Sequence, residues 1–240
     1  MKIFLAPILM LATALQADEP VDLSGEFQLH LQSTNKILIP VDEEIAPPST
    51  LEFSDSMRLP GTTDLAKKGP HITDDLPFHY HLNREYAHLG PAYYKRRITI
   101  PAEWVYKETE LFLERVLWES RVWIDGKEVS SPKDSLNTPH IHNLGLLVPG
   151  DHELVIRVDN RMIHPAGDKG HAYGAQTQSL WNGIVGKMEL RPASFIHQVR
   201  VFPELDGTVT VKVNGNLTGG NLADIATQSP AYHPKPPPIS

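Results

Sequence analysis

The chain has 240 residues, 40% of them apolar, which is enough for one large domain with a packed core and argues against wholesale disorder. Its formal net charge of −7 is spread along the chain without a long basic run, which argues against nucleic acid and anionic membranes as main partners. The chain has no cysteine, which excludes thiolate catalysis, thiolate metal sites and a lipid-modified N-terminal cysteine.

The N-terminal segment 1–17 has the order of a secretory signal peptide. Lys2 precedes the apolar stretch Ile3–Leu15, and small residues around Ala14–Ala17 come before two acidic ones. The stretch is shorter than the roughly 20 residues that a membrane-spanning helix needs. The alternative is a buried N-terminal helix. We therefore expect a periplasmic or secreted bacterial protein, held together by its core without disulfides.

The segment Pro40–Pro77 shows little alternation and is rich in Pro, Asp and Thr. We expect a long surface excursion here that could border a binding site. The acidic pairs Glu43-Glu44 and Asp74-Asp75 within it are interpreted as solvated loop carboxylates.

Further along, apolar and polar residues alternate with a period of two, which indicates half-buried antiparallel strands. In His152–Val158, for example, Leu154, Ile156 and Val158 share one face. Leu111–Trp118 is apolar on both faces and is typical of a central strand. Two more alternating runs are Lys187–Arg191 and Thr208–Val213. The turn signals between runs are Asp125-Gly126, Pro149-Gly150-Asp151 and Leu205-Asp206-Gly207. Together they predict an all-β sandwich.

The four tryptophans and the C-terminal segment complete this prediction. Trp104 and Trp118 are expected in the core, whereas Trp123 could face solvent, an adjoining domain or a ligand. The alternation stops after Asn216, and residues 217–240, with the run Pro234–Pro238, are predicted to form a disordered Pro-rich tail. We find no internal repeat.

Five segments in order resemble the N-terminal sugar-binding domain of glycoside hydrolase family 2, the group that holds β-galactosidases, β-glucuronidases and β-mannosidases. The segments are LPGTTD (Leu59–Asp64), HLNREYAHLGPAYYKRRITIPAEW (His81–Trp104), LERVLWESRVWIDGKEV (Leu113–Val129), HELVIRVDNR (His152–Arg161) and WNGIVGKMEL (Trp181–Leu190). One such segment would be weak, but five in order are specific.

The resemblance implies a galactose-binding-domain-like jelly-roll sandwich over 18–194 and the first, incomplete hairpin of an immunoglobulin-like domain over 195–216. The family's catalytic (β/α)₈ barrel needs about 250 residues, for which this chain has no room. The resemblance therefore implies a truncated, non-catalytic scaffold or sugar-binding portion of a hydrolase that acts on terminal β-glycosides, expected to be β-galactosides. No catalytic residue, metal or cofactor is assigned to this chain, and the Asn-Glu dipeptide that marks the family's acid/base is absent from it.

Candidate sugar contacts come from the same resemblance. Asp134 occupies the place from which relatives send an acidic residue toward the substrate, and His140 and Asn143 share its loop region. The alternative for Asp134 is a turn-capping role. Trp181 and Asn182 could line the same edge; alternatively Trp181 plugs the end of the sandwich and Asn182-Gly183 forms a turn.

Other interpretations remain open. Arg84, with Glu85 and Tyr86, could contact sugar or pack between domains. The chain could instead be a stand-alone secreted carbohydrate-binding or adhesion module. His79-x-His81 and His140-x-His142 each place two imidazoles on one strand face, which could chelate zinc or copper, although hydrogen-bonding histidines are the simpler interpretation.

Overall fold

The alternating runs form antiparallel strands in a computed structural model, which describes residues 19–34, 36, 39, 43–72, 85–164, 180–193, 196–206, 208–217 and 220–221. The predicted signal peptide 1–17 and most of the predicted tail 217–240 lie outside the described residues, as do Asp74-Asp75, His79, His81 and Arg84. None of the helices described is long and apolar enough to cross a membrane.

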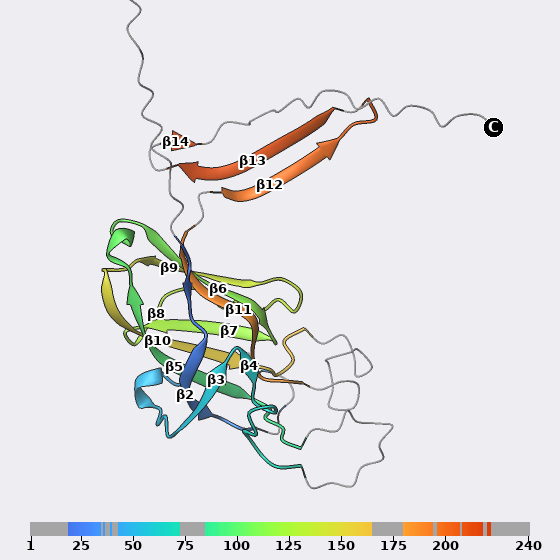
Figure 1. The fold of residues 1–240 in the computed structure, drawn as a ribbon. Coiled ribbons are helices and arrows are strands. Elements are labelled where there is room, and N and C mark those ends of the chain that lie inside the picture. The colour runs from blue at the N-terminus through green and yellow to red at the C-terminus, as the bar shows by residue number, and fades with distance from the viewer. Residues whose placement is uncertain are drawn as a thin grey trace, which may run out of the picture.

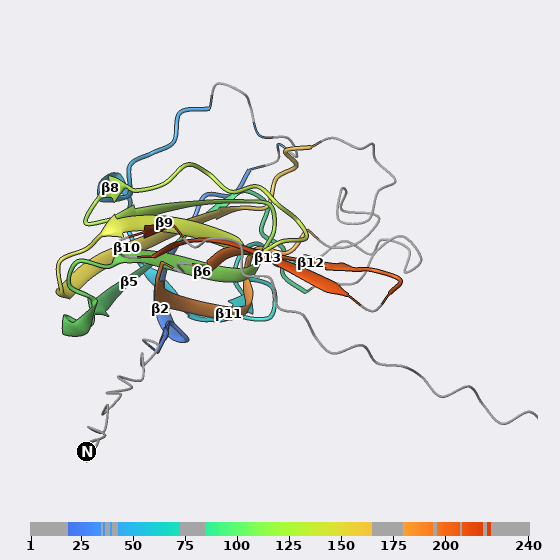
Figure 2. The ribbon, with the colours of Figure 1, turned by 90° about the horizontal axis from the view of Figure 1, so that it is seen from above.

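Two facing sheets form a sandwich (Figure 1). The five-stranded sheet consists of β1 (Val21–Asp22), β11 (Gly183–Pro192), β6 (Glu108–Val116) and β9 (His140–Leu146) in that order, with β4 (Gly61–Thr62) also paired to β11. The six-stranded sheet has the order β3 (Asp55–Leu59), β2 (Gly25–Leu31), β5 (Pro91–Ile100), β10 (Gly150–Asp159), β7 (Glu119–Ile124) and β8 (Lys127–Glu128). Figure 2 shows the strands of both sheets running side by side across the sandwich.

The chain crosses repeatedly from one sheet to the other between β5 and β11, which is the connectivity of a jelly roll. Two short 3₁₀ helices, η1 (Pro48–Thr50) and η3 (Ala102–Trp104), lie in the connections. The predicted all-β sandwich is thus confirmed.

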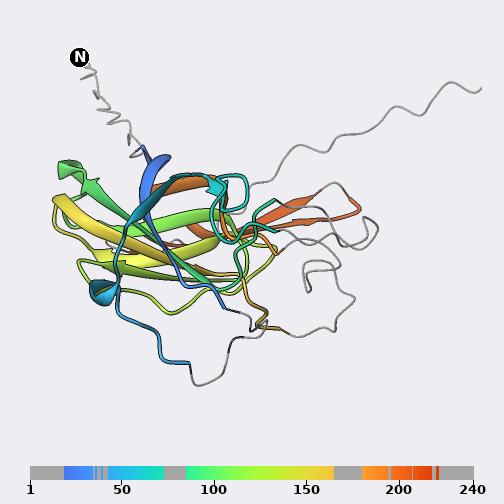
Figure 3. The ribbon, with the colours of Figure 1, turned by 90° about the horizontal axis from the view of Figure 1, so that it is seen from below.

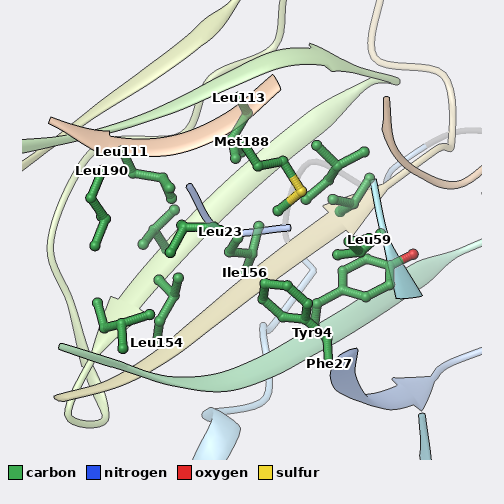
Figure 4. Packing of buried hydrophobic residues seen from close by; sticks show 14 of the residues in the cluster. Leu23, Phe27, Leu59, Tyr94, Leu111, Leu113, Leu154, Ile156, Met188 and Leu190 are labelled. Carbon is green, nitrogen blue, oxygen red and sulfur yellow. The ribbon is translucent and has the colours of Figure 1, made fainter. Parts of the chain in front are cut away.

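The core lies between the two sheets (Figure 4). Leu154, Ile156 and Val158 of β10 point inward, as their alternation predicted, and meet Leu111 and Leu113 of β6 from the facing sheet. All five are fully buried. Burial of apolar side chains at about 25 cal/mol per Å² is the main force that holds the two layers together.

The outer face of the six-stranded sheet is covered by part of the predicted surface excursion. Ile45, Leu51 and Phe53 pack on Tyr93 and on the indole of Trp123, which is only 5% exposed. Figure 3 shows this segment, which contains η1, running along the sandwich. Trp123 thus faces neither solvent nor a ligand, because this segment of the same chain covers it. Trp104 and Trp118 are buried, as predicted.

A third sheet follows the sandwich. β12 (Ile196–Pro203) and β13 (Val209–Leu217) form an antiparallel hairpin around Asp206, and β14 (Gly220–Asn221) pairs with the end of β13. Figure 1 shows this hairpin beyond one end of the sandwich. The predicted hairpin is therefore present. The prediction of a disordered tail from residue 217 was wrong for Leu217, Gly220 and Asn221, because these residues continue the strand pairing past Asn216.

Candidate functional site

The end of the sandwich that carries the β6–β7 connection brings together two of the candidate residues. A small apolar cluster here contains buried Leu117, Trp118 and Met162, with Trp181 half-buried against it. Residues 117 and 118 link β6 to β7, and residue 181 lies two positions before the start of β11, so strand ends from both sheets build the cluster. Trp181 therefore closes the end of the sandwich, the structural alternative that the sequence left open.

Asp134 lies at the rim of this cluster. Its carboxylate is 3.1 Å from Nε2 of His164, and both side chains are more than half exposed. The imidazole of His164 in turn meets the indole of Trp118 edge-on, with ring centroids 6.2 Å apart. The exposed carboxylate and imidazole are groups that can hydrogen-bond sugar hydroxyls, whereas the indole of Trp118 is fully buried and only supports the His164 ring.

Asp134 does not cap its turn. Oγ of Ser135 does so instead, accepting hydrogen bonds from the backbone N–H groups of Asn137 and Thr138 at 3.2 and 3.1 Å. The Asp134 side chain is thus left to face outward, toward His164. Sequence reasoning missed His164, because residues 134 and 164 come from separate loops whose meeting no local pattern encodes.

Asn182 is not a ligand contact in this structure, and Asn182-Gly183 is not a turn. The Asn182 side chain is fully buried, accepts a hydrogen bond from the Tyr94 hydroxyl at 2.8 Å and donates to the carbonyl of Gly90 at 3.0 Å. Gly183 begins β11 with φ of +138°, and a Cβ there would lie 2.2 Å from the carbonyl oxygen of Gly61. Glycine is needed for close strand approach, so the turn prediction was wrong.

His140 is also buried, which contradicts a direct contact with sugar in this conformation. Its Nδ1 lies 2.6 Å from Oγ of Ser120 and its Nε2 lies 2.8 Å from the carbonyl oxygen of Ser135, so both ring nitrogens have protein partners. Burial lowers the pKa of His140 below its ordinary value.

Asn143 is exposed but belongs to another surface. Its Nδ2 donates to the carboxylate of Glu108 at 2.9 Å, and its Oδ1 accepts from the N–H of Gly145 at 2.7 Å. The Asn143 side chain therefore braces the β6–β9 pairing, where the register shifts. Glu85 and Tyr86, named beside Arg84, both contact His71.

A buried ionic network on the outer face of the six-stranded sheet was not expected from the sequence. Asp159, which is fully buried, accepts from Nη2 of Arg157 and from Nη2 of Arg161, each at 2.6 Å. Arg157 also donates to Glu119 at 2.7 Å, and both guanidinium N–H₂ groups of Arg161 reach Glu43. Burial lowers the pKa of Arg161, but its hydrogen bonds to Asp159 and Glu43 outweigh that effect and raise it.

The prediction that Glu43 is a solvated loop carboxylate was therefore wrong. Its partner Arg161 is 118 positions away in sequence, and no local pattern connects the two. The alternation of β10 did place Arg157 on the outer face, but it gave no sign that the excursion covers that face.

Within the described ranges, no group of three or more His, Cys, Asp or Glu side chains could hold a metal ion. His140 and His142 do share one face of β9, but both point inward to Oγ of Ser120, at 2.6 and 2.8 Å.

Comparison with known proteins places this fold. No family model and no curated protein matches the chain. Three solved structures of β-glucuronidases do match it. The enzyme of Faecalibacterium prausnitzii has a TM-score of 0.59 and 20% identity, and the match covers 85% of this chain and 36% of that one. The enzyme of Ruminococcus gnavus has a TM-score of 0.60 and 17% identity, covering 89% of this chain and 38% of that one, and the enzyme of an uncultured Clostridium sp. has a TM-score of 0.55 and 17% identity, covering 84% and 34% respectively. The chain thus shares its fold with about a third of the length of these glycosidases, and the resemblance seen in the sequence is confirmed at the level of fold.

Proposed function

We propose that this sandwich is a non-catalytic, carbohydrate-facing domain of the glycoside hydrolase type. The fold that it shares with part of three β-glucuronidases supports the class of protein. The observation that carries the non-catalytic role is the use to which the chain puts its carboxylates.

A retaining glycosidase needs two carboxyl groups about 5 Å apart in an open cleft, one of which has a raised pKa and serves as general acid. The buried carboxylate of Asp159 is bound instead by Arg157 and Arg161, which hold it as a structural anion. Among the described carboxyl groups whose pKa clearly departs from the ordinary value, all are lowered. They are Asp22, Asp55, Asp125 and Asp206.

One surface depression, of about 640 Å³, offers no better catalytic site. It is lined by Glu26, Asp125, Asp151 and Glu153 together with basic residues. Asp125 accepts hydrogen bonds from the Glu153 N–H at 2.8 Å and from the ring of His152 at 2.6 Å, and Asp151 accepts from the hydroxyl of Thr99 at 2.7 Å. These two carboxylates hold strand ends together, a structural use.

The parent activity that we propose is hydrolysis of a terminal β-glycoside. The sequence resemblance led us to expect a β-galactoside, and the names of the solved structures add the β-glucuronide. The site that would contact the sugar is the exposed Asp134–His164 pair, whose imidazole meets the buried Trp118 of the end cluster. A stand-alone carbohydrate-binding module is the second candidate, favoured by the exposure of that pair.

The two candidates differ in sugar binding. We would titrate the purified chain with methyl β-D-glucuronide and methyl β-D-galactoside by NMR, and repeat the titration with Asp134→Asn and with the matched control Asp151→Asn. Saturable binding that Asp134→Asn alone abolishes supports the stand-alone module. Binding at millimolar concentration or weaker supports a domain that needs an adjoining catalytic domain. Turnover of nitrophenyl β-D-glucuronide or nitrophenyl β-D-galactoside above a heat-killed control would refute the non-catalytic role.

A further inference from the structure

A chain of hydrogen bonds crosses the interior between the two sheets. It links Ser130, His142, Ser120, His140 and Ser135, with successive distances of 2.5, 2.8, 2.6 and 2.8 Å. The two histidines belong to β9 of one sheet and Ser120 to β7 of the other, so the chain joins the layers. Both of its ends lie in the loop 129–139, which carries Asp134.

The proton positions follow from the last acceptor. The carbonyl oxygen of Ser135 can only accept, so Nε2 of His140 carries a hydrogen and its Nδ1 is an acceptor when the ring is neutral. The hydroxyl of Ser120 must then donate to His140 and accept from Nε2 of His142. Nδ1 of His142 is left as an acceptor for the Ser130 hydroxyl. Two neutral rings thus satisfy every bond in one direction.

One added proton can enter at either ring. At Nδ1 of His142 it reverses only the bond to Ser130, whereas at Nδ1 of His140 it makes Ser120 donate to His142, which then donates to Ser130. In both cases the Ser130 hydroxyl must use the carbonyl oxygen of Ser131, at the longer distance of 3.3 Å. A second proton cannot be absorbed, because Ser120 would face two donors and its own hydrogen would have no acceptor.

The surrounding charges also disfavour protonation. Burial is the main cause that lowers the pKa of both imidazoles, and for His142 the nearby His140 and Lys133 add to it, giving about 3. Asp134 and Glu119 act in the opposite direction on His140, but less strongly than burial. Leu113 and Leu111 lie opposite the two histidines on β6 and contribute no charge.

Ser120 also holds the middle of the loop 129–139. The backbone of Ser120 donates to the carbonyl of Lys133 at 2.8 Å and accepts from its N–H at 3.1 Å. The imidazole bonds to Ser130 and Ser135 flank this backbone pairing on both sides. Loss of both imidazole bonds would therefore free the two ends of the loop while the middle keeps only one pair of backbone bonds.

We propose that His140 and His142 form a pH-sensitive clasp, closed when both rings are neutral, that fixes the loop 129–139 and with it Asp134 against β9. Below the ordinary pKa of histidine, the open conformation of the loop is stabilised relative to the closed one, because opening exposes both rings to water, where they take up protons. This inference does not depend on what the loop binds, and so it stands apart from the proposed function.

The test is hydrogen exchange of the whole chain at pH 7.5 and pH 5.0, corrected for intrinsic exchange rates. Peptides from 129–142 are expected to lose at least roughly tenfold in protection at pH 5.0, while β5 and β10 keep theirs. In His140→Gln/His142→Gln each amide supplies one acceptor and one donor but cannot be protonated, so the loss should disappear. The matched control is His152→Gln, which replaces a histidine that bonds the carbonyl of Val148. This control should lose protection in 129–142 at pH 5.0 as the wild type does.

Two results would overturn the clasp. One is equal protection of the loop at both pH values, and the other is the same loss in the double Gln variant. If that variant does not fold, NMR of the wild type decides: long-range ¹H–¹⁵N correlations at pH 7.5 must show both rings with hydrogen on Nε2. A ring that carries its hydrogen on Nδ1 would contradict the proposed direction of the hydrogen bonds from Ser130 to Ser135.

Discussion

The buried ionic network makes a quantitative prediction for Asp159→Asn. The carboxylate accepts four hydrogen bonds: one from Nη2 of Arg157 and three from Nη2, Nε and the backbone N–H of Arg161, at 2.6, 2.6, 2.9 and 3.1 Å. An asparagine keeps the shape but turns one oxygen into an N–H₂ group. Wherever that group sits, it points a donor at a guanidinium donor.

The cost follows from burial. Both guanidinium groups are only 1% exposed, so water cannot replace the lost anion. Breaking a buried pair by removing one partner costs about 3–5 kcal/mol of the free energy of unfolding. For a domain of this size, each kcal/mol lowers Tm by about 2–4 °C, so the variant should melt roughly 6–20 °C below the wild type.

Urea unfolding followed by tryptophan fluorescence measures this loss. The matched control is Asp151→Asn, at an exposed carboxylate that accepts from Thr99 at 2.7 Å and lies 3.8 Å from Arg97. This control should cost less than about 1 kcal/mol. If Asp159→Asn also stays within about 1 kcal/mol of the wild type, the network does not stabilise the sandwich and this reasoning is wrong.

Three further outcomes are expected. Gly183→Ala should lower the free energy of unfolding in urea by roughly 3 kcal/mol or more, because its Cβ would meet a backbone carbonyl at 2.2 Å. The control Gly145→Ala, also at positive φ but in open space, should lower it by about 1–2 kcal/mol, and equal losses would contradict the close approach. Tyr94→Phe should cost about 1–2 kcal/mol by leaving Oδ1 of buried Asn182 without its donor, and a neutral result would argue against that bond. Folding lowers the pKa of His142 from 6.5 to about 3, so the unfolded chain takes up the proton at a higher pH than the folded chain does. The stability that neutral His142 contributes is therefore complete above pH 6.5 and falls by about 3 kcal/mol at pH 4.5. His142→Gln should flatten the measured dependence of the free energy of unfolding on pH, and an unchanged slope would refute this.

The layers of the fold could be predicted from sequence because they depend on local alternation. Leu154, Ile156 and Val158 face the core as predicted, and Asp125-Gly126 joins β7 to β8 as a hairpin. The dipeptide signal failed at Gly183, where glycine serves close packing between strands. A glycine that makes a turn and one that admits a neighbouring backbone look the same in a single sequence.

The site was predicted less well because its contacts are long-range. Asp134 and Trp181 lie at the same end of the sandwich, yet the partner of Asp134, His164, comes from a separate loop. The predicted contacts His140 and Asn182 are buried, since their polar groups hold strands and loops together. Polar residues at strand ends can serve the fold or a ligand, and only the three-dimensional structure separates the two.

The central proposal is that no carboxylate among the described residues of this sandwich breaks a glycosidic bond. Its most direct test is incubation of the chain with 2-deoxy-2-fluoro glucosyl, galactosyl and glucuronyl fluorides, which trap the glycosyl-enzyme intermediate of a retaining glycosidase, followed by intact mass measurement. We predict an unchanged mass with all three reagents. A stoichiometric sugar adduct on any Asp or Glu of the sandwich would contradict the account.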